Sequence, residues 1–141
     1  MKYNENCYYC TKSQLLSDLM IEFAQLEVST LFLVRDQTHK GRCVVAYKEH
    51  TKEIFDLPKA EFEAFMRDVA RAAKAVNEAV KPDKINYGSY ADTNPHLHFH
   101  IVPKYKDGYS WGKIFELSPE KKHYLSDGEY KDLIANIKSY L

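Results

Sequence analysis

One short run of this chain, in which histidine alternates with large apolar residues, constrains the fold more than any other. It reads HLHFH over residues 96–100 and continues as IVP. Successive side chains of a β-strand point to opposite faces. A strand through this run therefore places three imidazoles on one face and apolar side chains on the other. The apolar face can anchor the strand in a core, while the imidazoles can exchange protons, bind metals or attack phosphorus.

The composition fits a single domain with a hydrophobic core over residues 1–141. Of the 141 residues, 45% are hydrophobic and 13% are aromatic, which suits one core rather than two. Residues 1–12 and 106–141 are expected to be an N-terminal segment and a C-terminal extension with a helix. The formal net charge is zero, so bulk charge gives no reason to expect nucleic acid or an acidic membrane as a partner.

The cellular location is predicted from segments that the sequence lacks. No stretch approaches the ~20 apolar residues of a membrane span, and the first residues have no apolar signal-peptide region. We therefore expect a cytoplasmic protein without a membrane partner, in which the three cysteines form no structural disulfides.

The hydrophobic pattern predicts an α+β fold with an antiparallel sheet of about five strands, one long central helix and a C-terminal helix. Apolar residues repeat at helical spacing after Pro58 until Lys81-Pro82, and a last helix begins near Ser126. Short links between adjacent strands favour antiparallel pairing. Pro103 is expected to limit the last strand, which makes Lys104 a solvated residue or a phosphate attractor. The predicted strands cover residues 21–26, 30–34, 42–47, 84–90 and 96–103, and residues 13–20 are expected to form a short helix or turn.

The histidine run has three interpretations. Single histidines are usually ordinary surface or core residues, but strict alternation of three makes that reading weak. A metal site is the second, although His96 and His100 would lie ~13 Å apart along a strand, so one ion is not expected to bind all three. The third is nucleophilic catalysis by His98, with its second ring nitrogen held by a hydrogen bond and a flanking imidazole assisting.

The run and its flanks resemble the histidine triad (HIT) superfamily of nucleotide hydrolases and transferases. NPHLHFHIVPKY is similar to the His-φ-His-φ-His-φ-φ signature of that family, where φ is apolar. GRCVVAYKEH, INYGSYADTNPH and ENCYYC resemble its second strand, its asparagine-containing strand with a phosphate loop, and the Cys-x-x-Cys opening of many bacterial members. The similarity covers roughly residues 5–105 in the same order.

The resemblance implies a reaction and roles for the three histidines. His98 would attack the α-phosphate of a dinucleoside polyphosphate or a nucleoside phosphoramidate and form a nucleotidyl-histidine intermediate. His100 would orient His98 and contact phosphate oxygens, and His96 would support the site or bind a metal. The resemblance also implies a homodimer. Two alternatives stay open: a catalytically weak nucleotide-binding or regulatory protein, and a zinc-binding module without catalysis.

The resemblance further implies residues that bind the nucleotide. Asn86 matches a phosphate-contacting asparagine, while Thr93 and Asn94 lie in the phosphate loop or simply form a turn. Arg42 stands where the family commonly has a fourth histidine. It holds phosphate with two donors or is a solvated strand end. Asp36 is the nearest acidic candidate for the ribose contact.

Cys7 and Cys10 form a C-x-x-C pair that can be a metal site, a redox motif or a chance pairing. No βαβ pattern supports the redox reading. Two cysteines need two further donors to bind zinc, usually histidines. The resemblance implies His50 and His96, and hence a structural zinc that ties the N-terminus to the sheet.

Overall fold

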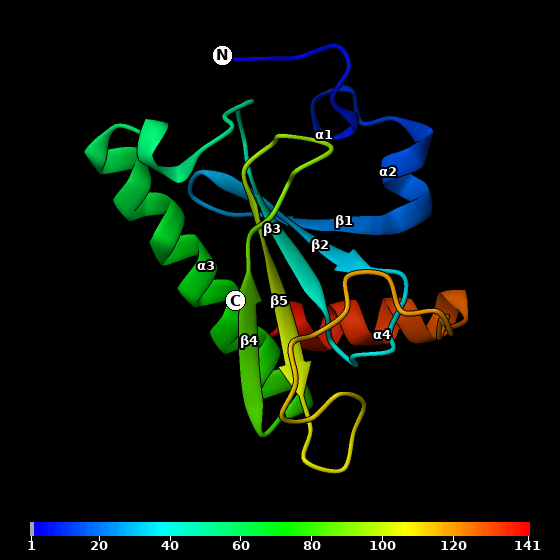
Figure 1. Ribbon diagram of the computed structural model, residues 1–141. Coiled ribbons are helices and arrows are strands. Elements are labelled where there is room, and N and C mark those ends of the chain that lie inside the picture. The colour runs from blue at the N-terminus through cyan, green and yellow to red at the C-terminus, as the bar shows by residue number, and fades with distance from the viewer. Residues whose placement is uncertain (1) are drawn as a thin grey trace.

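Five strands form one antiparallel sheet in the computed structural model, which describes residues 2–141 (Figure 1). Their spatial order is β1-β2-β3-β5-β4, so the histidine strand β5 lies between β3 and β4. In this register Val44 is opposite His100, and His100 is opposite Gly88. The strands are β1 (Met20–Gln25), β2 (Ser29–Val34), β3 (Cys43–Tyr47), β4 (Lys84–Gly88) and β5 (His98–Lys104).

Four α-helices and one 3₁₀ turn surround the sheet. The long helix α3 ends at Lys81, which adopts a left-handed conformation with φ of 49° just before Pro82. The last helix begins with a capping box, in which Ser126 and Glu129 satisfy each other's backbone N–H groups. The helices are α1 (Tyr8–Thr11), α2 (Gln14–Leu19), α3 (Lys59–Val80) and α4 (Asp127–Lys138), and the 3₁₀ turn is η1 (Ile54–Asp56).

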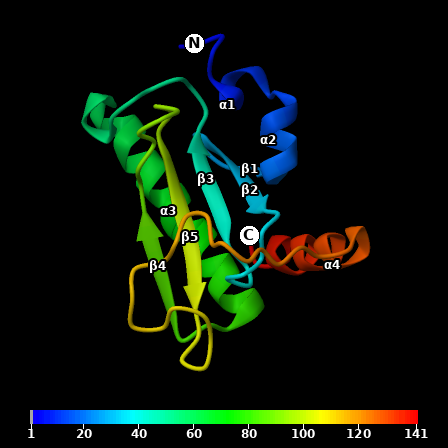
Figure 2. The same ribbon diagram turned by 45° about the vertical axis from the view of Figure 1, so that its right-hand side comes forward.

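The two faces of the sheet bury alternate residues of the same strands. Leu31, Leu33, Val45 and Ile101 point to the α3 side and join the core that this helix covers. The intervening residues point to the other side, where the N-terminal helices cover part of the sheet (Figure 2). Those on the second side are Phe32, Val34, Val44 and Ala46, packed with Cys7, Tyr9, Leu16 and Met20. We call the first the α3 face and the second the histidine face.

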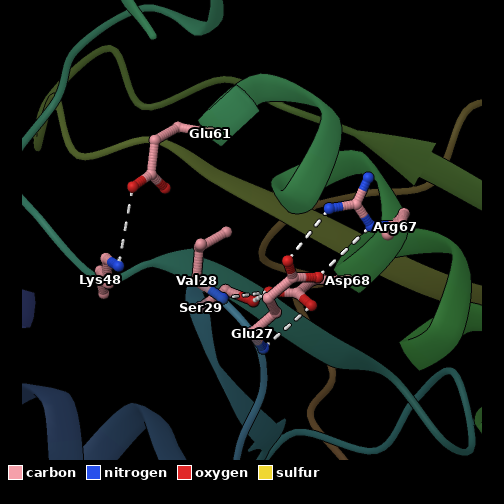
Figure 3. Close-up of polar contacts among 7 residues, drawn as sticks. All are labelled: Glu27, Val28, Ser29, Lys48, Glu61, Arg67 and Asp68. Carbon is pink, nitrogen blue, oxygen red and sulfur yellow. Dashed lines mark hydrogen bonds and ion pairs between the residues drawn. The ribbon is translucent and has the colours of Figure 1, made fainter. Parts of the chain in front are cut away.

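A buried carboxylate ties α3 to the turn between β1 and β2. Asp68 is 2% exposed and accepts hydrogen bonds from Glu27 N (3.1 Å), Val28 N (2.8 Å) and Ser29 Oγ (2.6 Å) (Figure 3). The neighbouring Arg67 forms an exposed ion pair with Glu27. The carboxylate therefore satisfies backbone donors that the turn would otherwise leave unpaired.

Residues 105–126, which we call the C-terminal loop, run along the histidine face (Figure 2). Lys104 anchors the start of this loop, because its buried ammonium group donates to the Ser110 and Lys113 carbonyls at 2.8 and 2.7 Å. The expectation of a solvated or phosphate-attracting Lys104 is wrong, because β5 extends through it. Phe115 fits against Gly88, where an added Cβ would lie 2.7 Å from the Phe115 ring.

The predicted fold class is confirmed, with small differences at strand ends. β5 begins at His98 rather than His96, because Leu97 N bonds to the Thr51 carbonyl outside the sheet. β4 ends at Gly88 rather than Tyr90, because the hydroxyl of Ser89 takes over the hydrogen bond to the His98 carbonyl at 2.8 Å. Within residues 2–141, no helix is both long and apolar enough to cross a membrane.

Candidate functional site

The three histidines gather on the histidine face, as their alternation predicts. The rings of His98 and His100 lie side by side on β5, with centroids 5.1 Å apart. His96 precedes the strand, and the ring of Tyr9 packs against both His96 and His98 at 5.0 and 5.2 Å. The α3 core holds Leu97, Phe99 and Ile101 from the opposite face and so fixes the strand that carries the imidazoles.

His98 has the geometry of a neutral nucleophile. Its Nδ1 lies 2.7 Å from the carbonyl oxygen of His96, so Nδ1 carries the proton and donates it to that carbonyl. Burial lowers the pKa of His98, and this hydrogen bond opposes the shift only in part. The ring is therefore neutral at neutral pH, with a lone pair free on Nε2.

His98 and His100 line a cavity of about 550 Å³, a size that accommodates a small-molecule ligand. Its wall combines residues of the N-terminal segment, the loop after β2, residues 90–94 and the C-terminal loop. Tyr9, Tyr90 and Tyr124 supply aromatic surface, which can contact a nucleobase. Segments far apart in the sequence thus meet around two adjacent imidazoles.

Arg42 lines the same cavity as a buried cation. It is 4% exposed, and its guanidinium donates to the Leu117 carbonyl at 3.0 Å and faces His100 Nδ1 at 3.3 Å. Its buried Nε has no partner within the described chain, and no carboxylate of residues 2–141 forms an ion pair with it. Asp36 is near enough to favour the charged form of Arg42. A buried positive charge with unused donors suits an anion in the cavity.

The other predicted nucleotide-binding residues divide into two groups. Asp36, Thr93 and Asn94 line the cavity, whereas Asn86 does not belong to the described lining. Asn86 lies on β4 opposite Val102, two pairs further along the sheet than Gly88 and His100. The geometry therefore brings three of these four residues to the histidines and leaves Asn86 further away.

Two of the three cavity residues also have structural roles. Asp36 Oδ1 accepts from Thr38 N, Thr38 Oγ1 and His123 N, which holds the C-terminal loop to the loop after β2. Burial alone would raise the pKa of Asp36, but these hydrogen bonds outweigh it and lower the pKa. The amide of Asn94 donates to Cys7 Sγ at 3.6 Å, so this residue connects the cavity to the cysteine pair.

Cys7, Cys10, His50 and His96 form one cluster, whose ligand atoms all lie within 4.8 Å of one another. His96 Nδ1 lies 3.4 and 3.6 Å from the two sulfurs, and His50 Nδ1 lies 3.5 Å from Cys10 Sγ. Bond lengths of ~2.3 Å to sulfur and ~2.0 Å to nitrogen put such pairs about 3.5 Å apart around a tetrahedral zinc. The donor set and spacing therefore fit zinc.

The orientation of His96 also suits a metal ligand. Its Nε2 lies 2.7 Å from the Tyr47 carbonyl and donates to it, so Nδ1 is unprotonated and faces the sulfurs. Burial is the largest of the causes that lower the pKa of His96 to about 4. One residue thus serves two sites: its side chain belongs to the cysteine cluster and its carbonyl oxygen orients His98.

The sequence interpretation missed Tyr9 and the residues of the C-terminal loop that line the cavity, which are Leu117, Ser118, Lys122 and Tyr124. Tyr9 lies inside the C-x-x-C pair, so a metal site placed beside His96 could have indicated its contact with the histidines. Leu117 contributes a backbone carbonyl to Arg42, and no sequence pattern marks such a contact.

The HIT domain family model matches residues 20–107, which contain α3 and all five strands of the sheet, the histidine strand included. The chain belongs to the HIT domain family. It is 29% identical over 109 residues to adenosine 5′-monophosphoramidase hnt1 of Schizosaccharomyces pombe, covering 72% of this chain and 79% of that protein. It is 25% identical over 118 residues to protein hit of Bacillus subtilis, covering 79% and 80% of the two chains.

Solved structures share the fold over nearly the whole chain. A histidine triad protein from Bradyrhizobium japonicum has a TM-score of 0.82 at 19% identity, with 91% of this chain and 95% of that chain covered. A zinc-bound histidine triad family protein from Mycobacterium smegmatis has a TM-score of 0.66 at 20% identity, with 94% of both chains covered. Both likenesses cover more of the chain than the 88 residues of the family match.

Proposed function

We propose that this protein is a nucleotide hydrolase or nucleotidyl transferase that forms a nucleotidyl-histidine intermediate on His98. The observation that carries the proposal is the hydrogen bond from His98 Nδ1 to the His96 carbonyl, beside a cavity lined by a guanidinium whose Nε has no partner among residues 2–141. This bond leaves Nε2 as the nucleophilic atom, and Arg42 supplies a site for phosphate oxygens. Similarity to an adenosine 5′-monophosphoramidase supports a nucleotide as the substrate.

In the first step, the Nε2 lone pair of His98 attacks the α-phosphorus and the bond from phosphorus to the leaving group breaks. The bonding electrons depart with the leaving group. The imidazole becomes cationic as the Nε2–phosphorus bond forms, and the His96 carbonyl that accepts from Nδ1 stabilises this charge. Arg42 and His100 donate hydrogen bonds to the oxygens of the phosphoryl group.

In the second step, water or another acceptor attacks the same phosphorus. The bond to Nε2 breaks, its electrons return to the imidazole, and the proton of the acceptor passes to solvent. The neutral His98 with its proton on Nδ1 is restored. Asp36 and Thr93 are proposed to contact the nucleotide from the cavity wall, and Asn86 stays a predicted phosphate contact.

A zinc ion bound by Cys7, Cys10, His50 and His96 would supply a cross-link rather than chemistry. It would join the N-terminal segment to the residue whose carbonyl orients His98. The protein residues alone position the nucleophile in this proposal. A homodimer, a cytoplasmic location and the absence of nucleic acid and membrane partners stay predictions.

The nucleotidyl transfer proposal is tested by nucleotide release and by trapping of the intermediate. The wild-type protein is expected to release AMP from diadenosine triphosphate or from adenosine 5′-phosphoramidate. His98→Asn should lower kcat by about 10³-fold or more, because it removes the nucleophile. Rapid acid-free quenching followed by mass spectrometry should detect the nucleotidyl adduct on His98 in the wild type.

His123→Asn is the matched control, since this histidine is exposed and its side chain does not line the cavity beside His98. Equal rates for the wild type and His98→Asn would exclude His98 as the nucleophile. If the wild type binds AMP but releases none from either substrate, the nucleotide-binding alternative without turnover is favoured.

The zinc proposal has a separate test in metal content. Purified wild-type protein is expected to contain about one zinc per chain, and Cys7→Ser and Cys10→Ser should lose most of it. Cys43→Ser is the control, because Cys43 is buried on the α3 face away from the cluster. Unchanged zinc in Cys7→Ser and Cys10→Ser would disprove the ligand set.

A further inference from the structure

Resting on the proposed function, we infer that Arg42 makes the site selective for nucleotides whose α-phosphate carries an anionic leaving group, and disfavours phosphoramidates. Phosphoric anhydrides, including dinucleoside polyphosphates, belong to the favoured class. The inference begins from the contact of Arg42 with His100 and from the absence of an ion-pair partner for Arg42 among the described residues.

Arg42 fixes the position of the proton on His100. A guanidinium has only N–H donors, so the 3.3 Å contact from Nη2 requires His100 Nδ1 to accept. The ring proton of neutral His100 therefore lies on Nε2. His100 can donate one hydrogen bond from this atom to a phosphate oxygen while Arg42 occupies its other nitrogen.

The same contact prevents His100 from supplying a proton to a leaving group. A second ring proton would have to enter at Nδ1, next to a guanidinium that stays charged at any physiological pH. Burial, then Arg42 and His98, lower the pKa of His100 to about 3. At neutral pH His100 is thus a hydrogen-bond donor without a transferable proton, and a guanidinium does not replace it as an acid.

Cleavage of a phosphoramidate requires such a proton. When the P–N bond breaks, the electron pair goes to nitrogen, which leaves only if it is protonated. When the P–O bond of an anhydride breaks, the pair goes to the bridging oxygen and the phosphate-bearing leaving group, which is ADP for diadenosine triphosphate, departs as a stable anion. Because general acid catalysis contributes about 10²–10⁴-fold, its loss penalises the amine leaving group selectively.

The charge of Arg42 adds to this preference. The guanidinium is 4% exposed and forms its described hydrogen bonds with a backbone carbonyl and a neutral ring, so neither cancels its charge. Lys122 also lines the cavity, but its ammonium group is held by Ser118 Oγ and the Pro119 carbonyl. A substrate with additional phosphates therefore gains more from Arg42 than a monoanionic phosphoramidate does.

The test compares kcat/KM for diadenosine triphosphate and adenosine 5′-phosphoramidate at neutral pH in the wild type, Arg42→His and Arg42→Lys. The wild type is expected to favour the triphosphate by about 100-fold, within the range that general acid catalysis contributes. Arg42→His should reduce this ratio about tenfold or more, because a neutral imidazole lets His100 accept a proton. Arg42→Lys should keep the preference at a lower rate, because it keeps the charge but loses the two-point contact.

The outcomes separate the two proposals. A wild-type preference for the phosphoramidate, or a ratio that is the same in Arg42→His and wild type, would overturn the inference and leave the nucleotidyl transfer intact. Release of AMP from neither substrate by the wild type would overturn both. Thermal denaturation checks that each variant is folded, and if Arg42→His is not, the wild-type ratio and Arg42→Lys still decide.

Discussion

Two buried charged residues, one on each face of the sheet, differ in how far their hydrogen bonds are satisfied. On the α3 face, Asp68 is buried with three hydrogen-bond donors around its carboxylate (Figure 3). On the histidine face, Arg42 is equally buried but keeps an unpartnered Nε within the described chain. Buried polar groups normally find partners, so an unpaired one needs an explanation. The satisfied group stabilises the fold, and the unsatisfied group fits the anion site proposed above.

We expect this difference to separate residues that govern stability from residues that govern the proposed turnover. The same strands supply both sets, because their alternate side chains enter opposite faces. Substitutions on the α3 face should change the free energy of unfolding and leave the nucleotide chemistry unchanged. Substitutions on the histidine face should change pH dependence and kcat with smaller losses of stability.

The largest expected effect comes from Asp68→Ala on the α3 face. Loss of the carboxylate leaves the N–H groups of Glu27 and Val28 and the Ser29 hydroxyl without their partner. We expect a loss of about 3 kcal/mol in the free energy of unfolding, since each buried donor left unpaired is costly. Urea denaturation measures the loss, and kcat of the folded protein should stay within about twofold of wild type.

Arg67→Ala is the matched control on the same helix. Its ion pair with Glu27 is exposed, so its removal should lower the free energy of unfolding far less than the loss of Asp68 does. Equal losses in the two variants would mean that the Asp68 contacts do not stabilise the turn. A large drop in kcat for Asp68→Ala would show that the α3 face also controls the chemistry.

The next effect is a pH dependence contributed by His100. Burial, Arg42 and His98 lower the pKa of His100 in the folded state to about 3, below the ~6.5 of an unfolded chain. Above pH 6.5 both states are neutral; as the pH falls below 6.5 the unfolded state gains a proton that the folded state does not. The contribution of neutral His100 to stability is therefore fully present above pH 6.5 and is lost as the pH falls toward about 3.

Comparison of wild type with His100→Asn isolates this contribution. Between about pH 6.5 and 5, the wild type should lose about 2 kcal/mol more than the variant, because one proton is worth ~1.4 kcal/mol per pH unit. Urea midpoints are measured with a chelator present, so that metal binding by the cysteine–histidine cluster does not contribute to the pH dependence. Parallel curves for the two proteins would mean that His100 is not held neutral by its surroundings.

Alternation predicted the division between the two faces from sequence, because a strand has only two sides. His98 and His100 therefore fell on one face and Phe99 and Ile101 on the other without knowledge of the fold. The C-x-x-C spacing singled out Cys7 and Cys10, and the family resemblance supplied His50 and His96 as their partners, whose distances the pattern alone does not give. The division of the faces depends on local spacing, and the cysteine–histidine cluster depends on shared motifs. The structure reproduces both.

Contacts between distant segments escaped prediction, and so did the surroundings of single charged residues. Lys104 looked like a solvated residue after a strand, but the C-terminal loop supplies two carbonyls that bury its ammonium group. For Arg42 the sequence left two interpretations open, a phosphate contact and a solvated strand end. Its burial depends on Leu117, which lies 75 residues away in the sequence. Local patterns carry no information about such partners.

Apart from the control variants, the smallest expected effect on stability concerns Tyr9, which joins the cysteine pair to the histidines. Its ring packs against His96 and His98, and also edge-on against Phe32. Tyr9→Leu keeps an apolar side chain but loses these aromatic contacts, so we expect a loss of about 1 kcal/mol. Urea denaturation checks this value.

We expect Tyr9→Leu to lower turnover more than it lowers stability, as the contrast between the two faces predicts. A looser ring of His98 misplaces Nε2, and we expect kcat to fall about tenfold with little change in KM. Tyr9→Phe should keep wild-type kcat, because the ring rather than the hydroxyl makes the contacts with the imidazoles. Tyr8→Leu is the second control, since Tyr8 stacks on Tyr9 but not on a described histidine. If Tyr9→Leu lowers stability but leaves kcat unchanged, Tyr9 stabilises the fold and does not position His98. The histidine face would then contain structural residues beside the catalytic ones.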